Sequence, residues 1–210
     1  MAGRYDPGGV EAEFEPGSRR RVLRNHLGIT RVRDMAQVES QALLLVQAQF
    51  VDEYSAEHRF RAADIGHIHR TWLEKIYPWA GEYRQVNMGK GGFQFANAQL
   101  VDRLMMGLER GALARYTPCL PSPNAEIAEA IAVVHAELIL IHPFREGNGR
   151  VARILALLMG LQSKLPPLDF TPLSGRNRQA YIAAIHAAIG RNYRPLSRLF
   201  ERVIERTLSA

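Results

Sequence analysis

The segment His142-Pro-Phe-Arg-Glu-Gly-Asn-Gly-Arg150 concentrates residue types that could do chemistry. A Gly-x-Gly turn in front of a helix presents free backbone N–H groups and the positive end of the helix dipole, an arrangement that suits phosphate. Gly147 and Gly149 also permit a ligand to approach the backbone closely. Arg150 and Arg153 are three residues apart on one face of the helix, so both guanidinium groups could reach one polyphosphate. The segment predicts an anion site.

Two further side chains in this segment could act on a bound phosphate. Glu146 offers a carboxylate, and Mg²⁺ usually takes one or two carboxylates together with phosphate oxygens. His142, at the end of the preceding helix, has a side chain that can serve as a base near neutral pH. The same residues could instead form a plain turn, a pair of surface charges and a buried histidine. So many functional types within nine residues favour a site.

The segment resembles the signature of the Fic family, His-x-Phe-x-(Asp/Glu)-Gly-Asn-Gly-Arg-x-x-Arg, and meets every fixed position of it. The resemblance continues through Asn25–Thr30, His69-Arg70, Trp79–Arg84 and Lys90–Gly92, and so covers roughly residues 20 to 205. Fic enzymes are mostly helical and commonly transfer AMP from ATP to a Ser, Thr or Tyr hydroxyl of another protein. The resemblance therefore implies a protein adenylyltransferase that uses ATP and Mg²⁺.

The resemblance also implies a role for each matching residue. The catalytic base for the target hydroxyl would be His142, and the metal ligand would be Glu146. The nucleotide would be bound by the anion hole of Gly147, Asn148 and Gly149, by Arg150 and Arg153 on the outgoing β- and γ-phosphates, and by Tyr181 in the adenine pocket. A lone aromatic residue at helical spacing, such as Tyr181, is more often a core residue. The spacing of Phe144 from His142 directs Phe144 towards the core as a packing anchor.

Residues 82–96 predict the one β-hairpin of the chain. Polar and apolar residues alternate on both sides of Gly89-Lys-Gly-Gly92, which is typical of two short strands and a turn. In the family, such a flap clamps the target segment by main-chain pairing. The resemblance therefore implies that Lys90, Gly91 and Gly92 at the tip lie over the nucleotide and the acceptor side chain. The alternative is an ordinary exposed turn.

Most of the remaining chain is predicted to be helical. Apolar residues recur at helical spacing in most of these stretches, and Pro or Gly separates several of them. The predicted helices cover 34–52, 62–76, 97–116, 124–141, 149–163, 175–189 and 195–207. We therefore expect an all-α, Fic-type domain of about seven helices with one hairpin flap. Residues 1–20, rich in Gly, Pro and Glu, predict a flexible arm, and 21–210 a single Fic domain.

Composition excludes several classes of protein. The chain has 210 residues, of which 47% are hydrophobic and 23% charged, as in an ordinary globular domain. The sequence contains no apolar run of the ~18 residues that a membrane span requires. A single cysteine excludes an internal disulfide and a cysteine-clustered metal site. The first residues lack the order of a secretory signal, so we expect a bacterial cytoplasmic protein, with delivery into a host cell left open.

The charge balance leaves a second function open. Lys and Arg number 27 against 21 Asp and Glu, a net charge of +6 that suits a nucleotide, a nucleic acid or an acidic protein face. Only this charge and the basic run of residues 19–24 support a nucleic-acid-binding module, and no aromatic residues interleave the run. Among Fic-type reactions, transfer of UMP, phosphocholine or phosphate is the alternative. The intact Gly-Asn-Gly centre favours AMP over the phosphate transfer of the Doc-like branch.

Control of the activity is the last feature that the sequence addresses. Many Fic proteins carry a helix with Ser/Thr-x-x-x-Glu-Gly/Asn, whose glutamate pairs with the arginine equivalent to Arg153. Here Ser197 and Glu201 have that spacing, but Arg202 stands where Gly or Asn belongs. We therefore expect that Glu201 does not reach Arg153. Restraint would then come from a separate antitoxin-like partner, or be absent.

Overall fold

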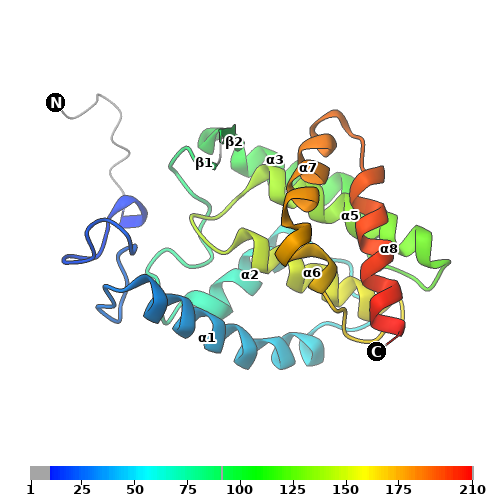
Figure 1. The fold of residues 1–210 in the computed structure, drawn as a ribbon, viewed down its shortest axis with the longest axis horizontal. Helices are drawn as coiled ribbons and strands as arrows, with labels where there is room; N and C mark the ends of the chain where they lie inside the picture. Colours follow the sequence, from blue (N-terminus) through cyan, green and yellow to red (C-terminus); the bar gives the residue numbers. More distant parts are fainter. Residues whose placement is uncertain (1–9, 91, 210) are drawn as a thin grey trace.

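Helix α5 (Asn124–Ile141) lies at the centre of the computed structural model, which describes residues 10–90 and 92–209 (Figure 1). This helix is apolar on nearly every side, and twelve of its residues are buried. A helix that is hydrophobic all round has to be covered by other elements. Helices α6 (Asn148–Gln162) and α8 (Arg194–Leu208) pack against it.

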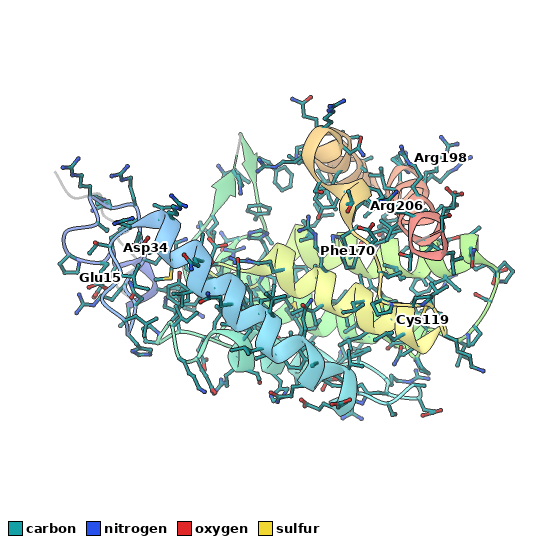
Figure 2. All side chains as sticks on the ribbon, turned by 60° about the horizontal axis from the view of Figure 1, so that its bottom comes forward. Glu15, Asp34, Cys119, Phe170, Arg198 and Arg206 are labelled. Atoms are coloured by element: carbon teal, nitrogen blue, oxygen red, sulfur yellow. The ribbon has the colours of Figure 1, made fainter. Side chains whose placement is uncertain are left out.

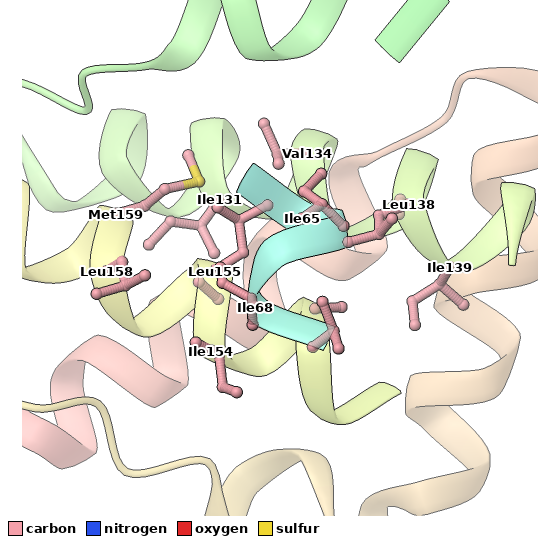
Figure 3. Close-up of a cluster of buried hydrophobic side chains, with 14 of the residues drawn as sticks. Ile65, Ile68, Ile131, Val134, Leu138, Ile139, Ile154, Leu155, Leu158 and Met159 are labelled. Carbon is pink, nitrogen blue, oxygen red and sulfur yellow. The ribbon is translucent and has the colours of Figure 1, made fainter. Parts of the chain in front are cut away.

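Branched apolar side chains from three helices form the core around α5. Figure 3 shows isoleucines of α2 (Ala62–Leu73) meeting Ile, Val, Leu and Met side chains of α5 and α6. Burying each such side chain stabilises the fold by roughly 1.5–3 kcal/mol. The labelled members are Ile65, Ile68, Ile131, Val134, Leu138, Ile139, Ile154, Leu155, Leu158 and Met159, all buried. The core therefore fixes the relative positions of α5 and α6, which carry the two ends of the motif.

The remaining helices surround this core. Helix α1 (Val32–Glu53) packs on α2 and α6, whereas α7 (Arg178–Ala187) packs on α8. The predicted helix over 97–116 is divided into a 3₁₀ turn (Ala98–Leu100), α3 (Val101–Leu108), a π turn (Glu109–Leu113) and α4 (Ala114–Tyr116). In the π turn, Glu109 accepts a hydrogen bond from the backbone N–H of Ala62 at 2.8 Å, which joins it to the start of α2.

The hairpin is much shorter than predicted. Strands β1 (Gly89–Lys90) and β2 (Phe93–Gln94) pair in antiparallel register, Gly89 opposite Gln94 and Lys90 opposite Phe93. Residues 82–88 are irregular because side chains take the place of a strand ladder there. Glu11 accepts from the backbone N–H of Gln85 at 2.6 Å, and Asn87 accepts from that of Ala98 at 2.9 Å.

Residues 10–20 lie within the expected flexible arm but contact the rest of the protein. Phe14 and Leu23 form an isolated antiparallel bridge. The backbone carbonyl of Glu11 accepts from Nε of Arg145 at 3.0 Å, and Glu15 accepts from the backbone N–H of Asn25 at 3.1 Å. Residues 1–9 lie outside the described part. The division of the chain at residue 20 stays a prediction.

The predicted architecture is confirmed. The described residues contain seven α-helices of eight residues or more, together with one hairpin. The long outer helix α8 runs at the opposite end of the molecule from residues 10–20 (Figure 1). Figure 2 shows Arg198 and Arg206 on it, far from Glu15 and Asp34. No helix among residues 10–90 and 92–209 has the length and hydropathy needed to cross a membrane.

Candidate active site

His142 ends helix α5 in a backbone conformation that few residues other than glycine adopt. Its φ and ψ are 54° and 60°, in the left-handed region, and Pro143 follows. A residue other than glycine in this region is held there at a cost of roughly 1–2 kcal/mol. The backbone N–H of His142 still donates to Leu138 at 3.0 Å, so the chain turns sharply at the last helical bond. The backbone therefore leaves the helix at His142, while the imidazole stays within reach of the last turn of α5.

The ring of His142 is fixed on two sides. It stacks on Phe95, with ring centroids 3.6 Å apart and planes inclined by 13°. Nδ1 lies 3.2 Å from the carbonyl oxygen of Ile139, which can only accept, so Nδ1 carries the proton. Nε2 is therefore the nitrogen with a free lone pair. Such a nitrogen can take a proton from a hydroxyl group.

The electrostatic surroundings keep this imidazole neutral. Burial lowers the pKa of His142 to about 4, and the positive charges of Arg84 and Lys90 add to that lowering. The hydrogen bond to Ile139 and the negative charge of Glu146 act in the opposite direction. At pH 7 the side chain is therefore in the form that a base requires.

The turn after His142 is held by the side chain of Asn148. The Asn148 amide accepts from the backbone N–H of Phe144 at 2.9 Å and donates to the carbonyl of the same residue at 2.7 Å. Asn148 is only 2% exposed. Its side chain therefore stabilises the turn, and only its backbone N–H is available to an anion.

Phe144 is the packing anchor that its spacing predicts. It is fully buried and stacks on His69 at 3.9 Å between ring centroids. His69 accepts from the N–H of Gly81 at Nδ1 (2.8 Å), and its Nε2 donates to the carbonyl of Glu146 at 3.1 Å. Burial lowers the pKa of His69 to about 4. This neutral histidine on α2 therefore joins the motif turn to the segment before the hairpin.

The amino end of α6 supplies the amides of the predicted anion hole. Gly147 precedes the helix with φ +84°, and a Cβ there would lie 2.7 Å from the ring of Trp72. Its N–H donates to Oε1 of Glu146 at 2.9 Å. Asn148 and Gly149 are the first two helical residues, whose N–H groups have no acceptor within the helix. Two of the three predicted amides therefore face outwards.

Arg150 is positioned by a carboxylate on a different helix. Its Nη1 donates to Oε2 of Glu39 at 2.7 Å, and its guanidinium lies 4.5 Å above the ring of Trp72. The other oxygen of Glu39 accepts from the hydroxyl of Tyr77 at 2.6 Å. Nη2 of Arg150 lies 3.4 Å from Oε1 of Glu146. The guanidinium is therefore fixed on one edge and directed towards the motif on the other.

Arg153 has no such partner. No carboxylate of the described residues pairs with it, and its buried Nε has no hydrogen-bond acceptor. Glu201 lines a different cavity beside the first turns of α5, with Glu126, Arg194 and Arg198. No salt bridge joins Glu201 to Arg153 among the described residues, and the expectation that Glu201 does not reach Arg153 stays a prediction. An orphaned arginine nitrogen beside the cavity indicates a place for an anionic ligand.

The motif residues line one cavity of about 540 Å³. Residues of the hairpin and of the start of α7, which lie outside the motif, also line this cavity. The predicted site residues that line it are Lys90, His142, Glu146, Gly147, Asn148, Gly149, Arg150, Arg153 and Tyr181. Gly92 lies in the hairpin turn with φ +82° and is not among the lining residues, and Gly91 lies outside the described residues.

Tyr181 belongs to both the cavity wall and the core. Its hydroxyl lies 2.8 Å from Nε2 of His135, whose Nδ1 lies 3.2 Å from the carbonyl of Ala152. Burial raises the pKa of Tyr181 to about 12 and lowers that of His135 to about 4. The hydroxyl is therefore engaged within the protein, and only the ring faces the cavity.

The residues present fit a magnesium ion bound together with a nucleotide. No group of three or more His, Cys, Asp or Glu side chains in the described part could hold a metal by itself. Glu146 offers a carboxylate that is 49% exposed, with Oε1 bonded to Gly147 and with no donor to Oε2 among residues 10–90 and 92–209. One free carboxylate oxygen plus phosphate oxygens is a usual Mg²⁺ environment.

The side chains that position the site were not identified from the sequence. Glu39, Phe95 and Arg84 lie far from the motif along the chain, and each contacts a motif residue directly. A signal was present for one of them, because Glu39 is a carboxylate within an otherwise apolar helical stripe. Such a buried charge requires a partner.

Fold and cavity together define a helical domain that presents backbone amides and arginines to an anion beside a neutral histidine. Residues 59–159 match the profile of the Fic/DOC family. Over these residues the chain carries a domain of the Fic/DOC family.

Relatives of known sequence agree with this assignment. The chain is 29% identical over 131 residues to a probable protein adenylyltransferase, y4lH, of Sinorhizobium fredii, covering 59% of this chain and 68% of that protein. It is 32% identical over 151 residues to the protein adenylyltransferase Fic of Nematostella vectensis, covering 70% of this chain. The chain spans only 33% of the length of that second relative.

Solved structures share the fold. The N-terminal Fic domain of an effector from Bartonella sp. AR 15-3 superposes with a TM-score of 0.80 at 19% identity, covering 99% of this chain and 97% of that one. BepC of Bartonella tribocorum, a VirB-translocated effector solved with bound AMPPNP, gives 0.75 at 23% identity and covers 92% and 96%.

Proposed function

We propose that the protein transfers AMP from ATP to a Ser, Thr or Tyr hydroxyl of a target protein. One observation carries the proposal. The unprotonated Nε2 of His142 lies in the same cavity as two outward-facing amides and two arginines. A base beside a cradle for several phosphates suits attack of a hydroxyl on a nucleotide. Relatives named as protein adenylyltransferases, and a Fic structure holding AMPPNP, support the same reaction.

In the proposed reaction, the oxygen of the target hydroxyl forms a bond to the α-phosphorus of ATP. The bond between the α-phosphorus and the oxygen that bridges the α- and β-phosphates breaks, and pyrophosphate leaves. His142 Nε2 takes the hydroxyl proton. The amides of Asn148 and Gly149 stabilise the charge on the transferred group, while Arg150 and Arg153 bind the departing phosphates. Positioning and charge stabilisation supply most of the catalysis.

Glu146 would hold Mg²⁺ against the phosphates. The ion would supply neutralisation of the negative charge that develops on the leaving pyrophosphate. Tyr181 would bound the adenine end of the cavity with its ring. The target segment would pair with the hairpin, whose β1 edge carries Lys90 at the rim of the cavity. We propose that the protein acts in the bacterial cytoplasm. We also propose that a separate antitoxin-like protein restrains the activity, because Arg153 has no carboxylate partner in the described chain.

A labelling experiment tests the proposal. Purified protein is incubated with Mg²⁺ and ATP labelled at the α-phosphate or at the γ-phosphate, in a bacterial lysate. Label on protein from the α-position alone is the expected result, and the His142→Ala variant should reduce it by roughly 10²–10⁴-fold while ATP binding persists. Label from the γ-position would show phosphate transfer instead. Labelled UTP run in parallel tests UMP transfer.

A further inference from the structure

Arg84 is a fully buried cation with no carboxylate partner in the described part of the chain. Its relative exposure is 0%, and its hydrogen bonds all go to backbone carbonyls. Nε donates to His142 at 2.6 Å and Nη1 to Val86 at 2.7 Å. Nη2 donates to Ala96 at 2.5 Å and to Ile141 at 3.2 Å.

These four carbonyls belong to two separate parts of the site. Ile141 and His142 are the last residue of α5 and the residue that ends it, and their carbonyls would otherwise have no intrahelical partner. Val86 and Ala96 flank the hairpin, one before β1 and the other after β2. The backbone N–H of Arg84 also donates to the carbonyl of Pro143 at 2.8 Å. One residue thus joins the base of the hairpin to the turn that carries the imidazole.

The geometry of the guanidinium suits this position. Its planar fork places several N–H groups at fixed angles, whereas a lysine ammonium is a compact charge with three donors. The negative end of the α5 dipole and the negative charge of Glu11 offset part of the charge. Burial nevertheless lowers the pKa of Arg84 from its usual value. The arrangement therefore has an electrostatic penalty that an apolar residue would not have.

We propose that Arg84 is a positioning residue that fixes the hairpin relative to His142, so that a segment docked on β1 presents its hydroxyl to Nε2. This inference rests on the function proposed above. The hairpin shares only a two-residue ladder, and Phe95, which stacks on the imidazole, comes immediately before Ala96. Movement of the hairpin at Val86 and Ala96 would shift both the strand on which the target docks and the Phe95 ring that supports His142.

Arg84 has a second effect through its charge. The charged groups that act on the imidazole of His142 are the cations Arg84 and Lys90 and the anion Glu146. Loss of the Arg84 charge would therefore make the imidazolium easier to form. Because burial is the largest cause of the lowered pKa of His142, a variant that keeps the charge at position 84 is needed to separate this effect from a change in burial.

The experiment compares Arg84→Met, which removes the fork and the charge, with Arg84→Lys, which keeps the charge. Arg59→Gln is the matched control, because Arg59 is an exposed arginine that also donates to a carbonyl, that of Ala114 at 2.9 Å. Circular dichroism and thermal melting establish that each variant is folded. Transfer rate, KM for the target, ATP affinity and the pH titration of the His142 ring by NMR are then measured.

We expect kcat for Arg84→Met to fall by roughly 10²-fold, because a misplacement of about 1 Å has that effect. ATP affinity should stay within about threefold, since Arg84 does not line the cavity. The His142 ring should titrate at higher pH in Arg84→Met. The Arg84→Lys variant should restore the wild-type titration but only part of the wild-type transfer rate. If Arg84→Met does not fold, the transfer rate and the His142 titration of Arg84→Lys are compared with those of the wild-type protein, and this comparison decides. A folded Arg84→Met with wild-type rate and wild-type titration overturns the proposal.

The test separates this inference from the proposed function. If the wild-type protein transfers no nucleotide, the proposed function fails, and the ring titration together with hydrogen exchange of the amides of the paired residues Lys90 and Phe93 still tests Arg84. Faster exchange of these amides in Arg84→Lys than in Arg59→Gln supports a positioning role. Equal exchange in both, together with an unchanged titration in Arg84→Met, contradicts it.

Discussion

Oε2 of Glu39 and Nη1 of Arg150 lie 2.7 Å apart, although 111 residues separate them in the sequence. The pair is largely shielded from water, since the two side chains are 8% and 28% exposed. The backbone carbonyl of Glu39 also accepts from Nε1 of Trp72 at 2.9 Å, and Trp72 lies beneath the guanidinium. Helices α1 and α2 thus preorganise an arginine that α6 carries.

This pair leads to the first prediction. Glu39→Ala should weaken ATP binding by roughly tenfold, because Arg150 would lose the charged hydrogen bond that orients it, an interaction of about 1.5–3 kcal/mol. AMP affinity should change little, because Arg150 is assigned to the terminal phosphates. Glu39→Gln, whose amide can still accept from Arg150, is the control and should stay within about threefold of wild type. Calorimetric titration with both nucleotides measures this, and tighter ATP binding by Glu39→Ala would show that Glu39 competes with phosphate.

The second prediction compares two glycines of the motif. Gly147 has φ +84° and its Cβ would lie 2.7 Å from Trp72, whereas a Cβ on Gly149 would meet nothing within 4 Å. Gly147→Ala should therefore lower the free energy of unfolding by roughly 1–3 kcal/mol through strain and displacement of Trp72. Gly149→Ala should unfold near the wild-type denaturant concentration. Equal midpoints for the two variants in urea would contradict the strained turn.

Helix positions and the motif could be predicted because both depend on local patterns. The stripe of Ile65, Ile68, His69 and Trp72 at helical spacing is buried as its periodicity indicates. Periodicity was less reliable on α1, where Leu45 belongs to the apolar pattern but is 80% exposed. The buried face of α1 is centred on Glu39, whose burial depends on Arg150 and Tyr77.

The contacts that position the site depend on tertiary structure, and the sequence does not contain a local signal for most of them. Alternation predicted a long hairpin over residues 82–96, yet the ladder has two residues on each side. Side chains bond to the backbone there in place of strand pairing: Glu11 and Asn87 each accept from a backbone N–H, and the buried Arg84 donates to four carbonyls. Likewise, no local pattern shows that the side-chain amide of Asn148 bonds to Phe144, which leaves its backbone N–H for the predicted anion hole.

A third prediction concerns the protonation of His142. In the free protein the pKa is lowered to about 4, with burial as the largest cause. A bound ATP analogue would bring several negative charges into the same cavity, and nearby negative charge favours the imidazolium. The pKa of His142 should therefore rise when the analogue binds. NMR titration of the ring proton in the free and bound protein tests this, and an unchanged or lower value would place the phosphates away from Nε2.

The fourth prediction concerns stability in acid. Burial lowers the pKa of both His69 and His135 to about 4, against 6.5 in the unfolded chain. Between pH 6.5 and 4 the unfolded state binds more protons, so the free energy of unfolding falls as the pH falls. Each histidine contributes a slope approaching about 1.4 kcal/mol per pH unit. Urea unfolding at pH 7, 6 and 5 measures the slope. His135→Gln should reduce the slope by the contribution of one histidine, which approaches about 1.4 kcal/mol per pH unit. Parallel pH profiles for the variant and wild type would contradict the assignment.

The last prediction concerns restraint within the chain. Glu201 lines a cavity with Arg194 and Arg198, and Arg153 is left without a carboxylate partner among the described residues. A guanidinium accommodates one bidentate partner well, so an inhibitory glutamate and a γ-phosphate would compete for it. Because Glu201 is not placed to compete, Glu201→Gly should change the rate of AMP transfer by less than about threefold. Its matched control is Glu205→Gly, one turn further along the exposed side of the same helix. Labelled transfer by both variants is compared with wild type. A large activation by Glu201→Gly alone would show that the carboxyl-terminal helix reaches Arg153 in solution and that the protein restrains itself.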